Sequence, residues 1–350
     1  MIAALALAMI AIVPEASPAG RVAALAQSQG FQGEILVATG GKVVLDHGFG
    51  TAVPGTSLRA RQPSDFRPGD IWRFASVTKQ IVAAITMQEV AAGRIALDAP
   101  VTRYLPGFKG PTGSKIAVRQ LLRHESGLPN PDADPATFTP SFKGQLDPLT
   151  GVCAGPVRDA PGASFDYNNC DYIVAGRLLE AVTHQPLARL VATRIAGPVG
   201  ARSLAVAGPA RQGFVDGKPE PAVSVAAYAG AASLTGTLAD LWRFDQALID
   251  GKLLPAAARA QMWDGQPKLG FAALGGWVFS VPLRGCKDAV RIVERRGQIG
   301  GVQVRNFILP DRNIVVIAAT NRAETDFGEV WMGSGLSYEL LSNAACEFDI

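Results

Sequence analysis

The chain has 350 residues, of which 48% are hydrophobic and 18% are charged. At about 150 residues per domain, this length indicates two domains, or one large domain with an insertion, with ample apolar material for a core. The low, balanced charge excludes global disorder. The formal net charge is only +3 and no run of five or more Lys or Arg occurs, so we expect no nucleic-acid partner.

The N-terminus is apolar over residues 1–13 and continues into a segment of small residues around Ser17-Pro18-Ala19. At ~1.5 Å per residue, a helix of this length is too short to span a bilayer of ~30 Å. We therefore predict a signal peptide over residues 1–19, a periplasmic or secreted protein, and no stable membrane span after processing. Because no Lys or Arg precedes the apolar stretch, a short membrane-leaning N-terminus or a buried helix is the alternative.

The cysteine count also bears on the compartment. Four cysteines are present, an even number, which permits disulfides in an exported chain. We favour the pairs Cys153–Cys170 and Cys286–Cys346, with buried free thiols as the alternative. The cysteines form no CxxC pair and the chain has only three histidines, so a zinc site is poorly supported. We expect no metal and no organic cofactor.

The N-terminal part of the chain alternates strand and helix signals. Residues 33–49 form two strand-like segments around a Gly-Gly pair, which is typical of a hairpin. Residues 71–75 indicate a short extended entry into a helix over 77–92, which lacks Gly and Pro and ends at Gly93. Apolar residues lie on nearly every side of this helix, so we expect it to be central and buried.

The middle of the chain is mostly helical, and strands return toward its end. Helical apolar spacing occurs at 117–126, 171–183, 187–196 and 237–250. Strand-like segments follow at 276–282, 289–297, 302–310 and 313–321, and a last helix is predicted over about 328–343.

This order of elements predicts an α+β fold rather than a regular β-α alternation. We expect an antiparallel sheet, flanked by helices, to be built from about 30–75 and 268–350. An all-helical part over about 95–265 would be inserted between these two regions. A ligand site is expected in the cleft between the two parts.

One S-x-x-K motif, from Ser76 to Lys79, opens the predicted buried helix. Residues three apart share a helix face, so Lys79 should lie beside the Ser76 hydroxyl. Burial lowers the pKa of a lysine, and a partly neutral amine beside a hydroxyl can accept its proton. The Ser76 N–H lies in the first turn, without an intrahelical partner, and can serve as an oxyanion donor. The alternative is a helix-capping serine followed by a lysine that extends to solvent.

A second group, Tyr167-Asn168-Asn169, precedes the helix predicted over 171–183. A nearby cation such as Lys79 lowers the pKa of a tyrosine, which would let Tyr167 act as an acid or a base. Asn169 has the groups to bind both Lys79 and a substrate carbonyl. The alternative is a turn asparagine beside a core tyrosine.

A third group, Gly297-Gln298-Ile299-Gly300-Gly301, precedes the strand predicted over 302–310. Adjacent glycines let a substrate approach a strand edge and expose backbone N–H groups, so we expect a second oxyanion donor here. The alternative is a simple turn or β-bulge.

In this order, the three groups resemble the serine β-lactamase and penicillin-binding protein superfamily, and most of all its class C β-lactamase-related branch. The similarity spans about residues 30–342 and includes FASVTKQ, LLRHESGLP, PGASFDYNN and SLTGTLADLWRF. It implies a β-lactamase/transpeptidase-like fold over residues 20–350. It also implies a serine hydrolase that acts through an acyl-enzyme on a small-molecule ester, amide or β-lactam.

The resemblance also implies roles for individual residues. Ser76 matches the nucleophile, and Lys79 and Tyr167 match the pair that shares the proton transfers, with the choice of base left open. Asn169 matches a substrate-binding position. Gly301 matches the residue whose N–H completes the oxyanion hole with that of Ser76. His124 matches no catalytic position, and we expect it to be structural.

The third group departs from the pattern that the resemblance implies. Gln298, Ile299 and Gly300 stand where the family usually has Lys-Thr-Gly or His-Thr-Gly, so the groups that hold a substrate carboxylate are missing. A lost charge-assisted hydrogen bond costs roughly 1.5–3 kcal/mol. Three arginines, Arg295, Arg296 and Arg305, are the candidates to replace this hydrogen bond.

We therefore expect an ester or small amide as the substrate rather than a penicillin. Two alternatives stay open at this point. One is a class C-type β-lactamase or D,D-peptidase in which an arginine binds the carboxylate. The other is a non-catalytic protein that binds cell-wall peptides or β-lactams.

Overall fold

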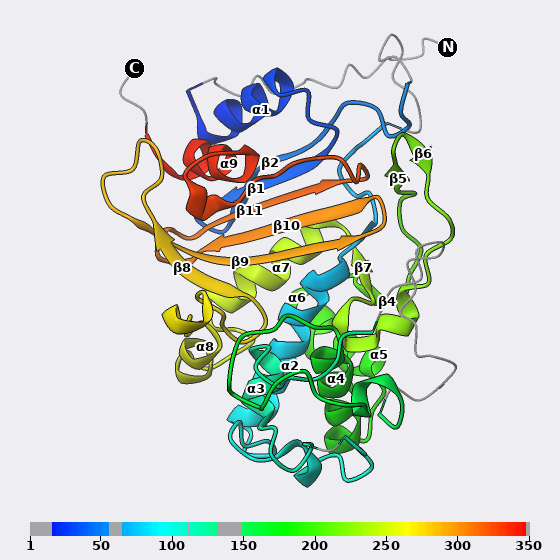
Figure 1. Ribbon diagram of the computed structural model, residues 1–350. Helices are drawn as coiled ribbons and strands as arrows, with labels where there is room; N and C mark the ends of the chain where they lie inside the picture. The colour runs from blue at the N-terminus through cyan, green and yellow to red at the C-terminus, as the bar shows by residue number, and fades with distance from the viewer. Residues whose placement is uncertain (1–15, 56–64, 111, 132–148, 348–350) are drawn as a thin grey trace, which may run out of the picture.

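The computed structural model describes residues 16–55, 65–110, 112–131 and 149–347. Most of the predicted signal peptide, residues 1–15, lies outside these ranges. The described chain contains a six-stranded antiparallel sheet in the order β2-β1-β11-β10-β9-β8 (Figure 1). Its strands are β1 (Gly33–Thr39), β2 (Lys42–Phe49), β8 (Trp277–Val281), β9 (Val290–Ile299), β10 (Val302–Leu309) and β11 (Ile314–Thr320).

Both ends of the chain meet in this sheet, because β1 pairs with β11. Helices cover its two faces (Figure 1). On one face lie α1 (Pro18–Ser28) and α9 (Leu336–Ala345), which pack on each other and on β2 and β11. On the other face, α7 (Leu238–Ile249) contacts β1 and β11. The helix over 238–249, which we assigned to the helical part, thus packs directly on the sheet.

The helical part lies beyond α7, at the bottom of Figure 1. At its centre is α2 (Thr78–Ala91), whose residues are almost all buried, as its apolar pattern predicts. Around it lie α3 (Val118–Leu122), α4 (Cys170–Thr183), α5 (Leu187–Leu190), α6 (Gly197–Val199) and α8 (Ala256–Met262).

The expectation that the part over about 95–265 is all-helical is wrong, because short strands in it connect the two parts. The strands β3 (Trp72–Arg73), β7 (Leu234–Gly236) and β4 (Ala205–Val206) form a three-stranded sheet at the entry to α2. A small hairpin of β5 (Phe214–Val215) and β6 (Lys218–Pro219) lies beside the β9–β10 turn, since Gly301 approaches the backbone of Phe214.

The predicted α+β fold is confirmed, and three elements differ from expectation. The last helix begins at Leu336, because Gly333 and Gly335 have φ of 70° and 92°, which a helix cannot include. The helix expected over 187–196 continues as a π-helix over Val191–Ala196. The helix expected over 117–126 ends at Leu122, since His124 adopts a positive φ of 60°.

Both predicted disulfides are present. Cys153 is bonded to Cys170 at the first residue of α4, and Cys286 is bonded to Cys346 just after α9. The first bond fixes the start of α4, directly after Asn169. The second links the segment between β8 and β9 to the end of α9. Arg21 of α1 also donates to the Cys346 carbonyl there, at 2.8 Å.

Candidate active site

Ser76, the predicted nucleophile, lies in a sharp turn between β3 and α2. Ala75 has a φ of 47°, a left-handed conformation that a non-glycine residue adopts only when its surroundings enforce it. Ser76 follows in a 3₁₀ turn over Ala75–Val77 and is half-buried, whereas Val77 is fully buried. The turn therefore directs the Ser76 side chain out of an otherwise buried segment and into a cavity.

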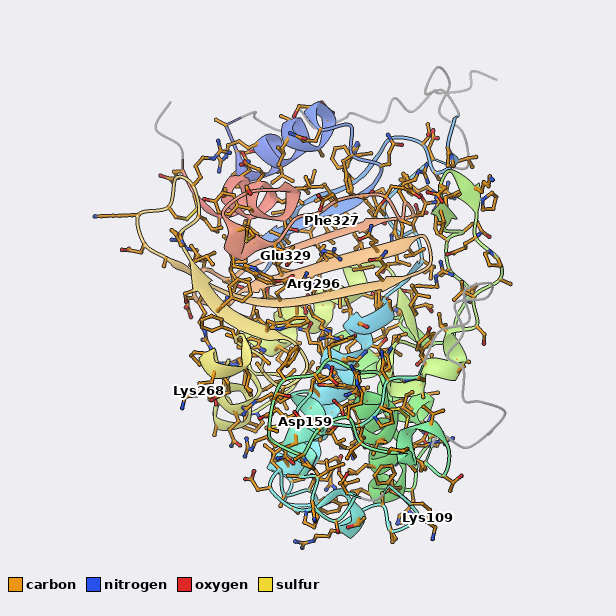
Figure 2. The ribbon with its side chains drawn as sticks, viewed as in Figure 1. Lys109, Asp159, Lys268, Arg296, Phe327 and Glu329 are labelled. Atoms are coloured by element: carbon orange, nitrogen blue, oxygen red, sulfur yellow. A yellow bond between two sulfur atoms is a disulfide. The ribbon has the colours of Figure 1, made fainter. Side chains whose placement is uncertain are left out.

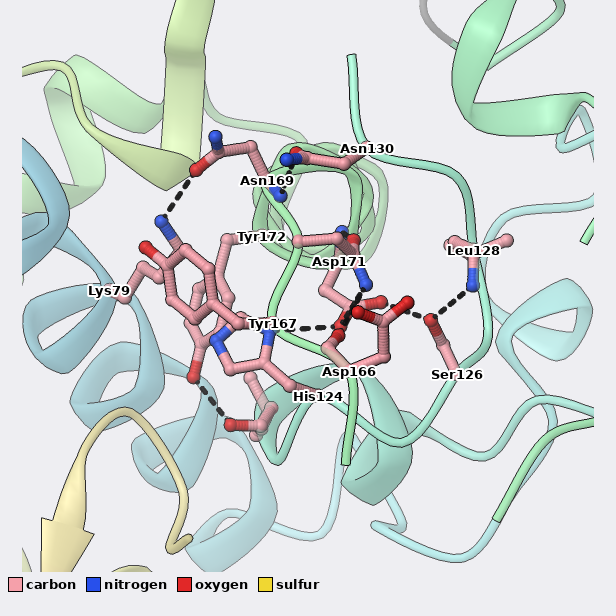
Figure 3. Close-up of polar contacts among 12 residues, drawn as sticks. Lys79, His124, Ser126, Leu128, Asn130, Asp166, Tyr167, Asn169, Asp171 and Tyr172 are labelled. Atoms are coloured by element: carbon pink, nitrogen blue, oxygen red, sulfur yellow. Dashed lines mark hydrogen bonds and ion pairs between the residues drawn. The ribbon is translucent and has the colours of Figure 1, made fainter. Parts of the chain in front are cut away.

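Two polar side chains contact the Ser76 hydroxyl, and one of them also binds Asn169 and a backbone carbonyl. The Ser76 Oγ lies 2.6 Å from the Tyr167 phenol oxygen. The Lys79 Nζ donates to Ser76 Oγ at 3.1 Å and to Asn169 Oδ1 at 2.8 Å. It also donates to the Ala231 carbonyl at 2.9 Å. The four predicted residues Ser76, Lys79, Tyr167 and Asn169 therefore share one hydrogen-bond network, and Figure 3 shows the Lys79–Asn169 contact beside the Tyr167 ring.

The electrostatics of this network bring two groups close to neutral pH. Burial lowers the pKa of Lys79 to about 8. Burial by itself raises the pKa of Tyr167, but the charges of Lys79 and Arg295 outweigh it and lower that pKa to about 8. A lysine and a phenol with similar pKa values, both touching one hydroxyl, can exchange its proton at low cost.

Arg295 completes the network from the sheet. Its Nε donates to the Ser76 carbonyl at 2.8 Å and its Nη2 donates to the Tyr167 phenol oxygen at 3.1 Å. The side chain is only 1% exposed. Arg295 was one of three arginines considered as carboxylate ligands, and the structure instead directs it at the serine turn and the tyrosine.

The strand β9 passes very close to the serine turn at Gly297. A Cβ on Gly297 would lie 2.2 Å from the Phe74 carbonyl oxygen and 2.9 Å from the Ser76 nitrogen. The strand edge therefore lies against the Ser76 N–H, and only glycine fits at this position. Among the described residues, the Ser76 N–H has no hydrogen-bond partner.

The register of β9 identifies which N–H lies next to it. A two-residue turn joins Ile299 to Val302, so these residues form a hydrogen-bonded pair and Gln298 falls in a non-hydrogen-bonded position. The Gln298 N–H therefore points away from β10, toward the edge that β8 leaves open beyond Glu294. Gln298 also lines the cavities at Ser76, so its N–H lies where a second oxyanion donor would be needed.

The prediction that the Gly301 N–H points with that of Ser76 to a common site is wrong. Gly301 is buried at the tip of the hairpin, and its N–H donates to Glu220 Oε2 at 2.7 Å. Glu220 also accepts from the Gly213 N–H at 2.8 Å and pairs with Arg73. This buried carboxylate, which no sequence motif indicated, ties the strand that leads to Ser76 to the β9–β10 turn.

A second buried network supports Tyr167 from behind (Figure 3). The His124 Nδ1 lies 3.0 Å from Asp171, which also accepts from the Ser126 hydroxyl and, at 3.0 Å, from the Asn168 amide. The His124 ring lies 4.5 Å from the Tyr167 ring, between centroids. Burial lowers the pKa of His124 well below its usual value, which keeps the imidazole neutral at pH 7. This position behind the tyrosine agrees with the structural role expected for His124.

Two cavities meet at Ser76, Asn169 and Gln298. One has a volume of about 300 Å³ and is also lined by Tyr228, Ala232, Ile299 and Gly300. The other has a volume of about 450 Å³ and is also lined by Tyr167, Trp277, Arg295, Arg296, Glu329 and Trp331. Sequence reasoning missed Tyr228, Trp277, Glu329 and Trp331, because none of them belongs to a recognisable motif.

The comparisons with known proteins place this site in a family. The Beta-lactamase family model matches residues 19–333, so the chain belongs to the β-lactamase family, whose relatives here are serine hydrolases.

Two curated relatives illustrate the range of this family. Esterase EstB of Burkholderia gladioli is 34% identical over 174 residues, which cover 44% of each protein. A protein of Bacillus subtilis (strain 168) named for penicillin-binding proteins, PbpX, is 27% identical over 252 residues, 67% of this chain and 59% of the relative. The chain thus matches only about half the length of these curated relatives.

Solved structures agree on the fold over nearly the whole chain. The D-amino acid amidase of Ochrobactrum anthropi SV3, complexed with D-phenylalanine, has a TM-score of 0.78 at 19% identity and covers 93% of this chain and 99% of its own. The D-stereospecific amidohydrolase of a Streptomyces species has a TM-score of 0.73 at 24% identity, covering 95% and 99%. The predicted β-lactamase/transpeptidase-like fold is confirmed.

The described residues give no sign of a metal centre or a membrane helix. No cluster of three or more His, Cys, Asp or Glu side chains suited to a metal ion occurs among them. In the same part of the chain, no helix has the length and apolar character needed to cross a bilayer.

Proposed function

We propose that the protein hydrolyses an ester or small amide bond through an acyl-enzyme on Ser76. The observation that carries this proposal is the position of the Ser76 hydroxyl, 2.6 Å from Tyr167 and 3.1 Å from Lys79, at the meeting point of two cavities. A nucleophile, a proton acceptor and two N–H donors around one cavity are the parts that acyl transfer needs.

The contacts suggest a sequence of proton transfers. Ser76 Oγ attacks the substrate carbonyl carbon, and its proton passes to Tyr167, whose phenolate form is stabilised by Lys79 and Arg295. The N–H groups of Ser76 and Gln298 bind the oxyanion. Tyr167 then returns the proton to the leaving oxygen or nitrogen. In the second half of the cycle a water molecule attacks the acyl-enzyme and gives its proton to Tyr167. Tyr167 then returns this proton to Ser76 Oγ as the acid product leaves.

The charges around the cavities support a substrate without a carboxylate. Arg295 is engaged with Ser76 and Tyr167, and Arg296 is paired with Glu329 and Glu294. Arg305 lies against the Phe327 ring, 4.7 Å from its centroid, and lines neither cavity. Each of the three arginines considered earlier is therefore either already paired or remote from Ser76, and none is an unpaired cation that could bind a substrate carboxylate there.

The proposal is tested by acylation and turnover in one set of measurements. We expect p-nitrophenyl butyrate to be hydrolysed faster than nitrocefin, and a fluorophosphonate to add one adduct mass that maps to the peptide containing Ser76. Equal or faster turnover of nitrocefin would contradict the substrate preference. Absence of an adduct together with absence of ester turnover would favour a non-catalytic binding protein.

A class C-type β-lactamase or D,D-peptidase is the second candidate. It is favoured by the relative named for penicillin-binding proteins and by the presence of two arginines, Arg295 and Arg296, on the wall of the larger cavity. Ampicillin resistance on expression in a sensitive host, lost in a Ser76→Ala variant, would support it over an esterase.

The pKa values of Lys79 and Tyr167 predict an alkaline pH dependence. Both are about 8, and the group that accepts the Ser76 proton must be deprotonated beforehand. We therefore expect kcat/KM to rise as the pH increases through about 8 and to level off above it. A pH profile of p-nitrophenyl butyrate hydrolysis measures this; a kcat/KM that falls between pH 7 and 9 would contradict it.

We also propose that the protein acts outside the cytoplasm. Two disulfides support this, because such bonds persist in oxidising compartments. The helix α1 begins with Ser17 as its cap, which accepts from the Gly20 N–H at 3.1 Å, and Ala19 is already buried. Cleavage of the signal peptide before Ser17 would keep this helix cap, whereas cleavage after Ala19 would remove it. The intact mass measured in the adduct experiment distinguishes the two cleavage sites.

A further inference from the structure

The wall of the larger cavity carries an arginine, Arg296, that contacts both aromatic and acidic side chains. The Arg296 guanidinium lies 5.2 Å from the centroid of the Trp277 ring and 5.1 Å from that of Trp331. Its Nε is 3.2 Å from Glu294, and its Nη1 donates to Glu329. The Arg296 side chain is still 23% exposed, but its charge is balanced by two carboxylates, which weakens its attraction for a substrate anion.

The two carboxylates differ in how they face the cavity. Glu294 is buried on β9, with a side chain only 3% exposed, whereas the Glu329 side chain is 39% exposed and lines the cavity with Ser76. Figure 2 shows Glu329 and Arg296 side by side at the β9 side of the sheet. Glu329 is therefore the acidic group that a substrate bound next to Ser76 would meet.

One oxygen of Glu329 has an unused capacity to accept a hydrogen bond. Its Oε1 pairs with Arg296, while its Oε2 is buried and has no partner among the described residues. A second carboxylate placed here would meet a like charge and an arginine already neutralised. An uncharged group would avoid this repulsion and could pack against the edges of the two indole rings. A cation would be attracted by the charge of Glu329, whose side chain is 39% exposed.

We propose that Glu329 is a specificity-determining residue, which reserves the Trp277–Trp331 cavity for uncharged or cationic groups and rejects substrates that carry a carboxylate there. This inference rests on the proposed function and specifies its substrate class. The physical cause of the preference for substrates without a carboxylate would be charge repulsion, because a repulsive group can reject one ligand as effectively as favourable contacts select another. Removal of the Glu329 charge would leave Arg296 with one carboxylate and return it to the cavity as an anion ligand.

The test uses two matched ester series, because the cavity can receive either the acyl or the leaving group. The first contains the p-nitrophenyl esters of pentanoate, of glutarate, and of 4-(trimethylammonio)butyrate. The second contains phenyl acetate and its 3-carboxy and 3-trimethylammonio derivatives. The measured quantity is the ratio of kcat/KM for the neutral ester to that for the anionic ester, in the wild type, in Glu329→Gln, and in Glu339→Gln.

Glu339→Gln is the matched control, because Glu339 lies on α9, forms an ion pair with Arg284 and lines neither cavity. We expect the wild type to prefer the neutral over the anionic ester by at least about tenfold in one series, and Glu329→Gln to reduce that preference about tenfold. The control should leave the ratio unchanged.

The outcomes separate this inference from the proposed function. If the esters are turned over and Ser76 is acylated, but the ratio in Glu329→Gln equals that of the wild type in both series, the inference is overturned alone. A change of the same size in Glu339→Gln also overturns it. If no ester is turned over and no adduct forms, the proposed function fails and the inference fails with it.

Discussion

Replacement of Ser76 by alanine is expected to lower kcat for p-nitrophenyl butyrate by about 10⁴-fold, since the covalent route through the acyl-enzyme is lost. The remaining hydrolysis would come from the oxyanion donors and the bound water alone. The fold should persist, because Lys79 keeps its hydrogen bonds to Asn169 at 2.8 Å and to the Ala231 carbonyl at 2.9 Å. Loss of one hydroxyl therefore leaves the buried ammonium satisfied.

Steady-state kinetics and a thermal melt check both halves of this expectation. Ser114→Ala is the matched control, because Ser114 is exposed on a loop and lines neither cavity. The Ser76→Ala variant should also lose the fluorophosphonate adduct, whereas Ser114→Ala should retain it. Ester turnover within tenfold of the wild type in Ser76→Ala would show that another group is the nucleophile.

Much of this site was predictable because its spacing is local. Ser76 and Lys79 are three residues apart at the start of one helix, so helical geometry alone brings the amine to 3.1 Å from the hydroxyl. The Tyr167-Asn168-Asn169 group lies at the start of α4, where a disulfide at Cys170 and the buried Asp171 network fix its backbone. The pairing of these two helices, however, came from the family resemblance and not from either segment by itself.

We predicted Gly301, rather than Gln298, as the second oxyanion donor, because the register of a hairpin cannot be derived from the local sequence alone. Gln298 and Gly301 are both neighbours of glycine, and both suit an exposed strand edge. Only the two-residue turn between Ile299 and Val302 decides that Gln298 faces the open edge while Gly301 lies at the tip, bonded to Glu220. The same register accounts for Arg295. It precedes Gly297 by two residues, so both lie on the same face of β9, and the Arg295 side chain donates to the Ser76 carbonyl.

The wall of the larger cavity was not predictable from the sequence. Trp277 begins β8, Arg296 lies on β9, and Glu329 and Trp331 lie in the segment before α9. These residues meet because two neighbouring strands, β8 and β9, and a later segment come together at one end of the sheet. Tertiary packing, rather than any motif, determines which side chains line the cavity next to Ser76.

Substitution of Gly297 by alanine is expected to have the largest effect on stability. The added Cβ would lie 2.2 Å from the Phe74 carbonyl oxygen, 2.9 Å from the Ser76 nitrogen and 3.1 Å from the Ala75 Cβ. Two of these neighbours are backbone atoms of a strained, buried turn, so the strand and the turn must separate. We expect a loss of about 3 kcal/mol in the free energy of unfolding. We also expect a decrease of about 10²–10³-fold in kcat, because the Ser76 and Gln298 N–H groups move apart.

Chemical denaturation and ester kinetics measure these two effects, and Gly107→Ala is the control. A Cβ on Gly107 would meet nothing within 4 Å, and its φ is not in the left-handed region, so its substitution should change the free energy of unfolding by less than about 0.5 kcal/mol. Because Gly297 is the point where β9 touches the serine turn, the two losses should occur together. A Gly297→Ala variant with wild-type kcat would mean that the Gln298 N–H is not the second oxyanion donor, even if the variant were less stable.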